Sequence, residues 1–514
     1  MMIVQKYIER IKKLEGKRRY FFSFIFGCLS GLSLPPVYMI PAAIVGFTAH
    51  LHQIEACTNK KQSFWLGWFY GLGFFVVGLY WISFALLVDV EQFGWMIPFA
   101  MFGIPAVLAI YTAIVSLITH KLKYTGYQRV ILFAVIWTAF EMLRGIFFTG
   151  FPWNLIGYIW TVSDSMLQIT GITGIFGLSF ITVLAFAMPY CINRNGKKPA
   201  IIAFSVLLLT FGFGQLRLWN AENTFYHQKI RIVQGNIEQQ NKWDEGYRSS
   251  IINKYLKMTV SKPFYAVKYV LWPESAIPYY LEADSFLTDA IGNVTPSGGF
   301  LITGSIRSER SELDFVGNIY NSIHTIDHNG TIISVYDKHH LVPFGEYVPL
   351  RSVLPIEKIT PGQKDFTQGD GIKTTPVQGM PSFSPLVCYE AIFPNAVIDK
   401  SNPPDMMINV TNDAWYGNSS GPYQHFNTVR VRAVEHGIPL IRAANNGISG
   451  VIDPYGRVLE KTKYGEDAVL DAKIPHALKS PTLYTKFGNY LIVLIMLAMC
   501  GFVFITGKNS KLTV

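Results

Sequence analysis

Three polar residues of this sequence each follow a run of strand-forming residues, and their types suit nucleophilic catalysis. Cys388 comes directly after Phe383 to Val387, and Glu274 and Lys338 end two other such runs. A cysteine placed where a strand breaks into a turn has an accessible sulfur. A lone cysteine is more often a small buried hydrophobe. The presence of the glutamate and the lysine as well makes a catalytic cysteine the better interpretation.

The chemistry of these residues is complementary. A thiol attacks well only as a thiolate, so Cys388 needs a base or a positive field beside it. Glu274 can be that base if partial burial raises its proton affinity. Lys338 brings positive charge to the sulfur and to the developing oxyanion, and backbone N–H groups after Cys388 complete the oxyanion hole. Such a site forms a thioester from an ester or amide and passes the acyl group to a second nucleophile.

The elements that must position these residues are strands interleaved with helices. The predicted strands are Ile230 to Ile237, Tyr269 to Trp272, Phe300 to Ile306, Asn321 to Ile326, Thr331 to Tyr336, Phe383 to Val387, Met406 to Val410, Pro439 to Ala443, Ser449 to Ile452 and Arg457 to Glu460. An Asn-Gly turn at 329–330 predicts a hairpin, and Phe426 to His436 has helical spacing of its apolar residues. This order predicts a two-sheet core covered by helices, an α-β-β-α sandwich.

Composition separates this α/β region from the rest of the chain. Half of the 514 residues are hydrophobic and only 15% are charged. The apolar residues concentrate in 20–218 and 488–506, whereas 228–480 has the composition of an ordinary globular domain. Predicted spans lie at about 20–34, 38–54, 64–88, 95–119, 129–148, 166–190, 199–217 and 488–506, although the first is short for a bilayer. The sequence predicts a polytopic α-helical membrane protein of about eight spans with an inserted α/β domain.

The charge distribution predicts the orientation of these spans. The net charge is +10, which could suggest nucleic acid, but seven basic residues crowd the first nineteen positions before an apolar run, as on a cytoplasmic flank. Alternate linkers carry Lys or Arg and the others carry none. We therefore expect a cytoplasmic N-terminus (1–19), a seven-helix membrane domain (20–218), an extracytoplasmic domain (219–487), an eighth helix (488–506) and a cytoplasmic tail (507–514).

The outer loop 149–160 is too aromatic to be only a tether. Tryptophan and tyrosine favour the headgroup level of a bilayer, so the loop is either an interfacial anchor or the wall of a lipid groove. Glu141 and Arg144, one turn apart in the fifth span, are costly in lipid unless they are paired or face protein. We expect either an intrahelical ion pair or a contact with a lipid headgroup.

The five cysteines define neither a metal site nor a disulfide framework. Cys388 alone lies in the globular region, and the other four lie in or beside apolar spans. Their spacing matches no metal-binding pattern. We therefore expect a free thiol at position 388 and no metal or other cofactor.

The whole chain resembles the apolipoprotein N-acyltransferase family, membrane-embedded members of the nitrilase (carbon–nitrogen hydrolase) superfamily. The stretches that carry the resemblance are Thr-Gly-Phe-Pro-Trp (149–153), Val-Gln-Gly-Asn-Ile (233–237), Trp-Pro-Glu (272–274), Leu-Val-Pro-Phe-Gly-Glu-Tyr-Val-Pro (341–349), Cys-Tyr-Glu (388–390) and Asn-Asp-Ala-Trp-Tyr-Gly (412–417). Soluble nitrilases lack both the spans and the Val-Pro-Phe-Gly-Glu stretch. The tandem His339-His340 departs from the family pattern, and we assign it no role.

The resemblance implies roles for particular residues. Cys388 is expected to be the nucleophile, Glu274 the base and Lys338 the charge on the oxyanion side. The further positions expected to support activity or bind substrate are Glu346, Tyr389, Glu390, Trp243 and Trp415.

The resemblance also implies a reaction and a place in the cell. The sn-1 ester of a phospholipid, preferentially phosphatidylethanolamine, acylates Cys388, and the N-terminal amine of a diacylglyceryl-cysteine apolipoprotein then takes the chain. The protein is expected in the bacterial inner membrane with its catalytic domain in the periplasm. The apolar, Pro- and Gly-broken segment 341–366 is expected to be a lid.

Two other functions compete with this one. A membrane-anchored amidase acting on a small substrate would share the three residues, but it gives no reason for seven spans before the domain. A transporter or receptor with a degenerate nitrilase-like sensor domain is disfavoured because the three residues are intact and the spans lack a chain of buried charges.

Overall fold

The computed structural model describes residues 2–309, 317–353, 357–360, 362 and 364–509. These residues form two compact units. Unit 1 takes its residues from 1–83, 95–220 and 482–514, and unit 2 consists of Phe84–Gly94 and Ala221–Pro481. The short segment Phe84–Gly94, which lies between apolar helices in the sequence, therefore belongs to the α/β unit.

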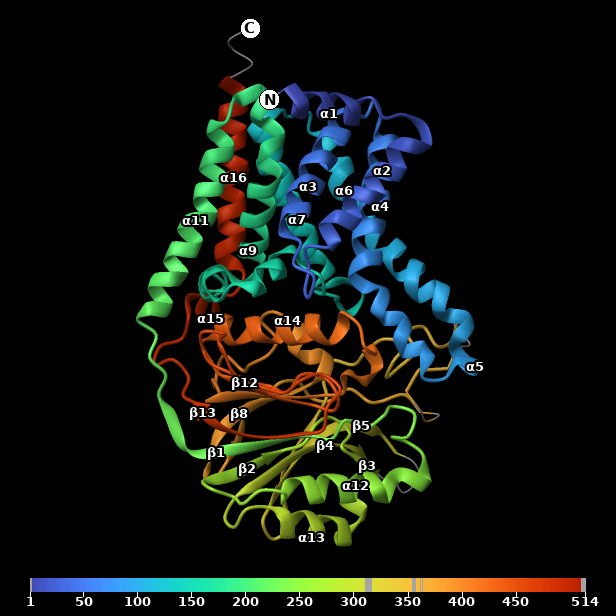
Figure 1. The fold of residues 1–514 in the computed structure, drawn as a ribbon, viewed down its shortest axis with the longest axis vertical. Helices are drawn as coiled ribbons and strands as arrows, with labels where there is room; N and C mark the ends of the chain where they lie inside the picture. The colour runs from blue at the N-terminus through green and yellow to red at the C-terminus, as the bar shows by residue number, and fades with distance from the viewer. Residues whose placement is uncertain (1, 310–316, 354–356, 361, 363, 510–514) are drawn as a thin grey trace. The chain divides into compact units, whose positions relative to one another are not determined.

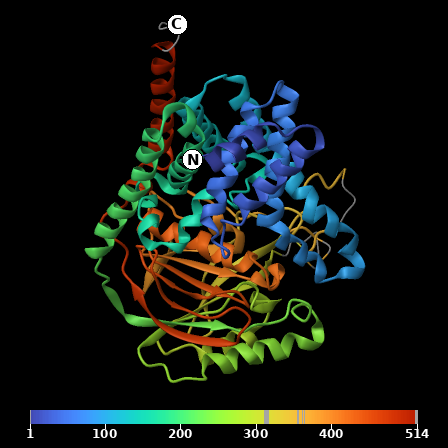
Figure 2. The same cartoon turned by 45° about the horizontal axis from the view of Figure 1, so that its top comes forward.

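Unit 1 is all helical (Figure 1). Its helices are α1 (Met2–Lys12), α2 (Gly16–Gly31), α3 (Ile40–Glu55), α4 (Lys60–Leu79), α6 (Ile104–Lys121), α7 (Gly126–Arg144), α8 (Asp164–Leu167), α9 (Thr170–Ala187), α10 (Ile192–Asn195), α11 (Lys198–Trp219), α15 (Leu483–Phe487) and α16 (Tyr490–Asn509). The C-terminal helix α16, drawn in red in Figures 1 and 2, packs on α7 through Val503, Ile131 and Leu132. Gly27 brings α2 so close to α4 that a Cβ there would collide with the Tyr70 carbonyl, as is common between membrane helices.

Five helices among the described residues are long and apolar enough to cross a membrane. They are Lys60–Leu87, Val90–Lys121, Thr170–Asn195, Lys198–Trp219 and Tyr490–Gly507. Helices also form at the other three predicted spans. However, α2 and α3 have 16 residues each and α7 carries Arg129, Glu141 and Arg144. The count of eight crossings therefore stays a prediction.

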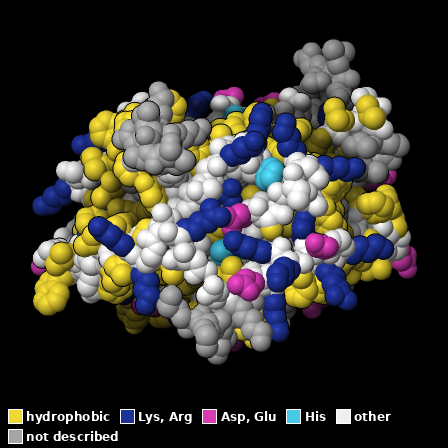
Figure 3. All heavy atoms as spheres, turned by 90° about the horizontal axis from the view of Figure 1, so that it is seen from above, with side chains coloured by type: hydrophobic (Ala, Val, Ile, Leu, Met, Phe, Trp, Pro, Cys, Tyr) yellow, Lys and Arg dark blue, Asp and Glu magenta, His cyan; other side chains and the backbone are white. Residues whose placement is uncertain are grey.

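Basic side chains gather at one end of unit 1. Figure 3 looks onto the end where α1 lies, over which Lys and Arg are widely spread. Lys12 of α1 and Arg194 of α10 both pair with Glu55 of α3, the former at 2.7 Å. The Lys12–Glu55 pair joins the basic N-terminal helix α1 to α3.

The aromatic loop 149–160 lies inside unit 1, which contradicts the interfacial anchor. Trp153 is 1% exposed and Tyr158 is 2% exposed. Glu141 accepts a hydrogen bond from the Ile156 N–H at 2.9 Å, and Arg144 donates to the carbonyls of Phe151 and Trp153 at 2.7 and 2.6 Å. The two charged side chains thus each bind the backbone of this loop. Their spacing along one helix could not predict these contacts.

Unit 2 contains two mixed β-sheets. The first has the order β13 (Ala468–Pro475), β1 (Phe225–Gln234), β2 (Val267–Leu271), β4 (Phe300–Ser308), β5 (Ile319–Asp327) and β6 (Ile332–Asp337), with β3 (Ile277–Tyr280) paired to β4. The second has the order β12 (Val458–Lys461), β11 (Gly450–Ile452), β10 (Leu440–Ala444), β9 (Met406–Thr411), β8 (Met380–Val387) and β7 (Thr375–Val377). The β5–β6 hairpin turns at Asn329-Gly330, as predicted.

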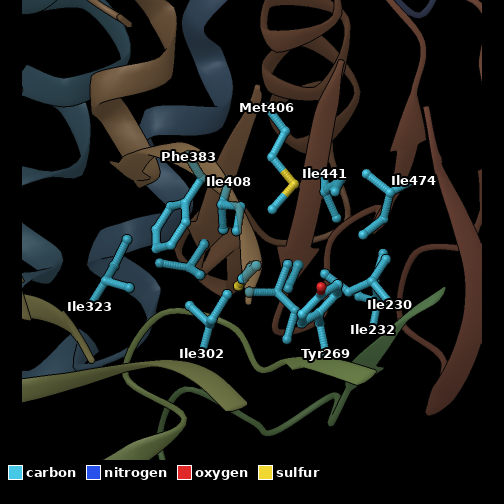
Figure 4. Close-up of a cluster of buried hydrophobic side chains, with 14 of the residues drawn as sticks. Ile230, Ile232, Tyr269, Ile302, Ile323, Phe383, Met406, Ile408, Ile441 and Ile474 are labelled. Atoms are coloured by element: carbon cyan, nitrogen blue, oxygen red, sulfur yellow. The ribbon is translucent and has the colours of Figure 1, made fainter. Parts of the chain in front are cut away.

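The two sheets pack face to face. Because side chains alternate along a strand, Ile302 and Tyr269 of the first sheet meet Phe383, Ile408 and others of the second in a shared core (Figure 4). The opposite faces are covered by helices, α12 (Glu245–Thr259) and α13 (Ser285–Val294) on the first sheet and α14 (Gly421–His436) on the second. The predicted α-β-β-α sandwich is confirmed.

Each strand predicted from the sequence is present in the structure. Sequence analysis missed the strands β3, β7 and β13 and the helices α12 and α13. The predicted helix 426–436 begins five residues earlier, at Gly421, where Pro422 in the first turn favours helix initiation.

Strand direction places the candidate catalytic residues at one edge of each sheet. In the first sheet β2 is parallel to β4, and β6 runs parallel to both because two antiparallel pairings separate it from β4. In the second sheet β8, β9 and β10 are parallel. The carboxyl ends of parallel strands share an edge, so the residues that follow these strands gather there.

Candidate active site

Lys338 lies between two carboxylates. Its Nζ is 3.8 Å from Glu274 Oε1 and 2.9 Å from Glu346 Oε2, and all three side chains are buried. Burial alone disfavours the ammonium, but the charges of Glu346 and Glu274 outweigh it and raise the pKa of Lys338. The lysine is a fixed positive charge, and the structure brings Glu346 to it from the loop after β6.

The carboxylate of Glu274 is held at both oxygens. Oε1 accepts from Asn321 Nδ2 at 2.8 Å, and Oε2 accepts from the Asn412 backbone N–H at 2.8 Å. Asn321 also donates to Glu346 at 2.9 Å. Lys242 donates to the Glu274 backbone carbonyl at 2.9 Å, and burial lowers the pKa of this lysine to about 8, against the attraction of nearby anions. Sequence analysis assigned no role to Lys242, Asn321 or Asn412, although Asn412 opens the motif 412–417.

Cys388 begins a tight turn directly after β8. Its φ is +49°, in the left-handed region that non-glycine residues rarely adopt. Such a turn presents the thiol at the sheet edge, and its strain persists only where the surroundings fix it. Burial raises the pKa of Cys388 to about 12, the charge of Glu274 adds to this, and Lys338 opposes it. The resting group is therefore a thiol, so attack needs a base and does not begin from a preformed thiolate.

Glu390 organises the backbone on either side of the site. Its carboxylate accepts from the Val387 N–H at 2.7 Å and from the N–H groups of His339 and His340 at 2.8 and 3.1 Å. Tyr336 Oη also donates to it, at 2.8 Å. One buried carboxylate thus links the end of β8, before Cys388, to the end of β6, before Lys338. The tandem histidines take part through their backbone N–H groups.

The remaining predicted residues divide between two places. The ring of Tyr389 lies 5.0 Å from that of Phe393 and 5.6 Å from that of His340, beside the Cys388 turn. Trp243 and Trp415 line a cavity of about 900 Å³ within unit 2. The structure therefore gathers Glu346, Tyr389 and Glu390 around the three central residues and places the two tryptophans at a neighbouring cavity.

A buried charged network below Cys388 was not predicted. His425 Nε2 lies 3.3 Å from the Cys388 carbonyl, and its Nδ1 lies 2.9 Å from Asp413 Oδ1. Arg442 donates to Asp413 Oδ2 at 2.7 Å. Because a carbonyl only accepts, Nε2 is the donor in its contact with Cys388. Arg442 and His425 outweigh burial and lower the pKa of Asp413 to about 2. The motif 412–417 contained Asp413, but His425 and Arg442 come from α14 and β10 and share no local pattern with it.

His425 is expected to orient the Cys388 peptide. In a trans peptide the N–H of Tyr389 points opposite to the Cys388 carbonyl, so fixing one fixes the other. His425→Gln keeps a donor near the Nε2 position, whereas His425→Asn keeps only one near Nδ1. We expect acylation of Cys388 to fall roughly tenfold further in His425→Asn than in His425→Gln. Intact-mass time courses measure this, and equal losses at equal melting temperature would refute the positioning role.

Among the residues that the structure describes, no group of three or more His, Cys, Asp or Glu side chains could hold a metal ion. The arrangement instead combines a thiol, a carboxylate and a fixed cation, which suits acyl transfer through a covalent intermediate.

Comparison with known proteins adds two family matches. The carbon-nitrogen hydrolase model matches residues 229–481, and the apolipoprotein N-acyltransferase N-terminal domain model matches residues 26–188. The chain is 36% identical over 474 residues to apolipoprotein N-acyltransferase of Rickettsia prowazekii (strain Madrid E), covering 91% of this chain and 95% of that one. It is 37% identical over 510 residues to the protein of that name from Brucella melitensis biotype 1, covering 95% and 96%.

Proposed function

Since the chain belongs to the apolipoprotein N-acyltransferase family, we propose that it N-acylates lipoproteins through a thioester on Cys388. The protein is a membrane-integral acyltransferase with lipid and lipoprotein substrates. One observation supports this mechanism. Glu274 and Lys338 lie 3.8 Å apart, and the charges of both act on the pKa of the buried Cys388 thiol. The proposed donor is the sn-1 ester of a phospholipid such as phosphatidylethanolamine.

In the first half-reaction Glu274 takes the proton of the Cys388 thiol as the sulfur attacks the ester carbonyl. The raised pKa of Cys388 makes this transfer concurrent with bond formation, because little thiolate exists beforehand. Lys338, kept charged by Glu346, stabilises the oxyanion together with the Tyr389 N–H. A donor of this kind is typically worth about 3 kcal/mol. Collapse releases the lysophospholipid, whose leaving oxygen receives the proton from Glu274.

In the second half-reaction the amine of a diacylglyceryl-cysteine attacks the thioester. Glu274 now accepts a proton from the attacking amine. The C–S bond then breaks, because the Cys388 thiolate is a better leaving group than the amine, and the thiolate takes the proton back from Glu274. The thioester must be sheltered from water between the two steps. The described part of the segment 341–366, which excludes 354–356, 361 and 363, supports this role: Leu350 and Val353 are 72% and 70% exposed, while Glu346 is buried beside Lys338. We therefore propose that 341–366 is a lid.

The ping-pong order is tested without any variant. Incubated with phospholipid alone, the protein should gain one fatty-acyl mass, removable by hydroxylamine. A diacylglyceryl peptide with a free amine should then discharge it, and its N-acetylated counterpart should not. An amidase-type hydrolase would instead release free fatty acid in each turnover without any amine, and that outcome would refute acyl transfer.

For orientation we propose eight spans with both termini in the cytoplasm and residues 219–487 in the periplasm of the inner membrane. The basic end of unit 1 supports this arrangement (Figure 3), because cytoplasmic flanks are rich in Lys and Arg. A reporter fused at position 300 should be active only as a periplasmic reporter, and one fused after 507 only as a cytoplasmic one. Cytoplasmic activity at position 300 would overturn the orientation.

A further inference from the structure

The cavity of unit 2 has walls of two kinds. One wall comes from the segment Phe84–Gly94 and includes Leu87, Val88 and Val90. The other includes Gln239, Trp243 and Lys358. The first offers apolar side chains beside the polar Asp89, Glu91 and Gln92, and the second offers hydrogen-bond donors and a positive charge.

Two donors on the polar wall lack acceptors among the described residues. Gln239 is 7% exposed and uses its Oε1 to accept from Asn412 Nδ2 at 2.6 Å, but its Nε2 has no partner. Trp243 Nε1 is likewise buried without a partner. Unpaired buried donors are rare in proteins because each costs about 1–3 kcal/mol. A ligand that brings oxygen acceptors would remove this cost.

The same wall carries a buried cation. Lys358 is 5% exposed, and its Nζ donates to the Thr360 carbonyl at 3.1 Å and to Thr360 Oγ1 at 3.2 Å. The other cation of the wall, Arg351, is engaged by Asp365 in a bidentate pair. Charge-assisted hydrogen bonds to anionic oxygens are stronger than neutral ones, so donors grouped with a lysine favour an anion.

The cavity wall also carries carboxylates that contact Gln92. Glu357 accepts from Gln92 Nε2 at 2.7 Å, and Asp89 accepts from the Gln92 backbone N–H at 3.0 Å. Together with Glu91 they add acidic groups to the cavity lining. A ligand with a phosphate and an ammonium group would match both the donors and these carboxylates.

The cavity is connected to the proposed base through one residue. Asn412 donates through its side chain to Gln239 and through its backbone N–H to Glu274 Oε2, at 2.6 and 2.8 Å. A group bound at Gln239 is therefore one residue away from the group that activates Cys388. This is the relation expected between the headgroup and the ester of one lipid.

We propose that this cavity binds the phosphodiester of the acyl-donor phospholipid, with Gln239 and Trp243 donating to its oxygens and Lys358 balancing its charge. The inference rests on the proposed function and adds to it a headgroup subsite. The apolar wall at Leu87, Val88 and Val90 faces the glycerol and the start of the acyl chains.

The test compares two acyl donors that differ only in the phosphoethanolamine headgroup. Initial rates of Cys388 acylation are measured by intact mass with dipalmitoyl phosphatidylethanolamine and with 1,2-dipalmitoylglycerol in the same detergent. Lys358→Met should reduce the rate with the phospholipid roughly tenfold more than the rate with diacylglycerol. Gln239→Glu, which keeps the acceptor for Asn412 but replaces the free donor with a negative charge, should show the same selective loss. Lys373→Met, at a lysine whose side chain is 69% exposed, is the matched control and should leave the ratio unchanged.

Soluble competitors identify the source of the phosphate. Glycerophosphoethanolamine should inhibit the wild type more strongly than inorganic phosphate at equal concentration, and Lys358→Met should weaken that inhibition. Equal or stronger inhibition by inorganic phosphate would assign the cavity to free anions and overturn the headgroup subsite. Equal losses with both lipid donors in both variants would also overturn it. If neither donor acylates the wild-type Cys388, the proposed function itself fails, which is a different result.

Discussion

Replacing Cys388 by alanine is expected to abolish both the acyl-enzyme and the transfer of the acyl chain to the peptide amine. No other cysteine is expected to substitute, because the remaining four belong to unit 1, whereas Glu274 and Lys338 belong to unit 2. Loss of a catalytic nucleophile typically costs on the order of 10⁴-fold or more in rate. Intact mass reports the acyl-enzyme, and acylation of a diacylglyceryl peptide reports transfer.

Cys388→Ser separates the two half-reactions. The hydroxyl fits the same turn but is harder to deprotonate, and an oxygen ester is a poorer acyl donor to an amine than a thioester. We expect slow acylation, a mass gain that hydroxylamine removes poorly, and almost no transfer. Persistence of peptide acylation in Cys388→Ala would exclude the covalent mechanism, as would transfer by the wild type without any detectable acyl-enzyme.

Glu274→Gln is expected to slow acylation by about 10²- to 10⁴-fold, the usual contribution of a general base. The variant also places an amide NH₂ where Glu274 now accepts from two donors, Asn321 and the Asn412 N–H. One of those hydrogen bonds must be lost in either orientation of the amide. Glu245→Gln, at a side chain that is 86% exposed, is the matched control and should retain wild-type rates.

The same variant tests whether Glu274 acts as a base or only as a neighbouring charge. Burial and the Glu274 charge both raise the pKa of Cys388, to about 12. Removing the charge lowers that pKa, so the thiolate fraction rises at any pH below it. Alkylation of Cys388 by iodoacetamide should therefore become faster in Glu274→Gln, while acylation by phospholipid becomes slower. If both reactions change in the same direction, Glu274 does not have the base role.

The sequence alone determined the chemical identity of the candidate site and the strands that carry it. Glu274, Lys338 and Cys388 each follow an apolar run, and such runs form strands because alternate side chains can enter a shared core. The same local patterns predicted the two-sheet sandwich and the Asn329-Gly330 turn. These features depend on residues that are close together in the chain, so their signal is visible without a structure.

Only the tertiary structure decided what surrounds those residues. His425, Arg442 and Lys242 approach the site from three different elements, and no spacing in the sequence relates them to Cys388. The pKa of Cys388 depends on its burial and on the positions of charges far away in sequence, so a thiol at rest could not be distinguished from a thiolate. Likewise, the spacing of Glu141 and Arg144 allowed an intrahelical pair or a contact with a lipid headgroup, and it gave no sign that each also binds the backbone of the loop 149–160. Burial and long-range contact set these energies, and both arise only when the chain has folded.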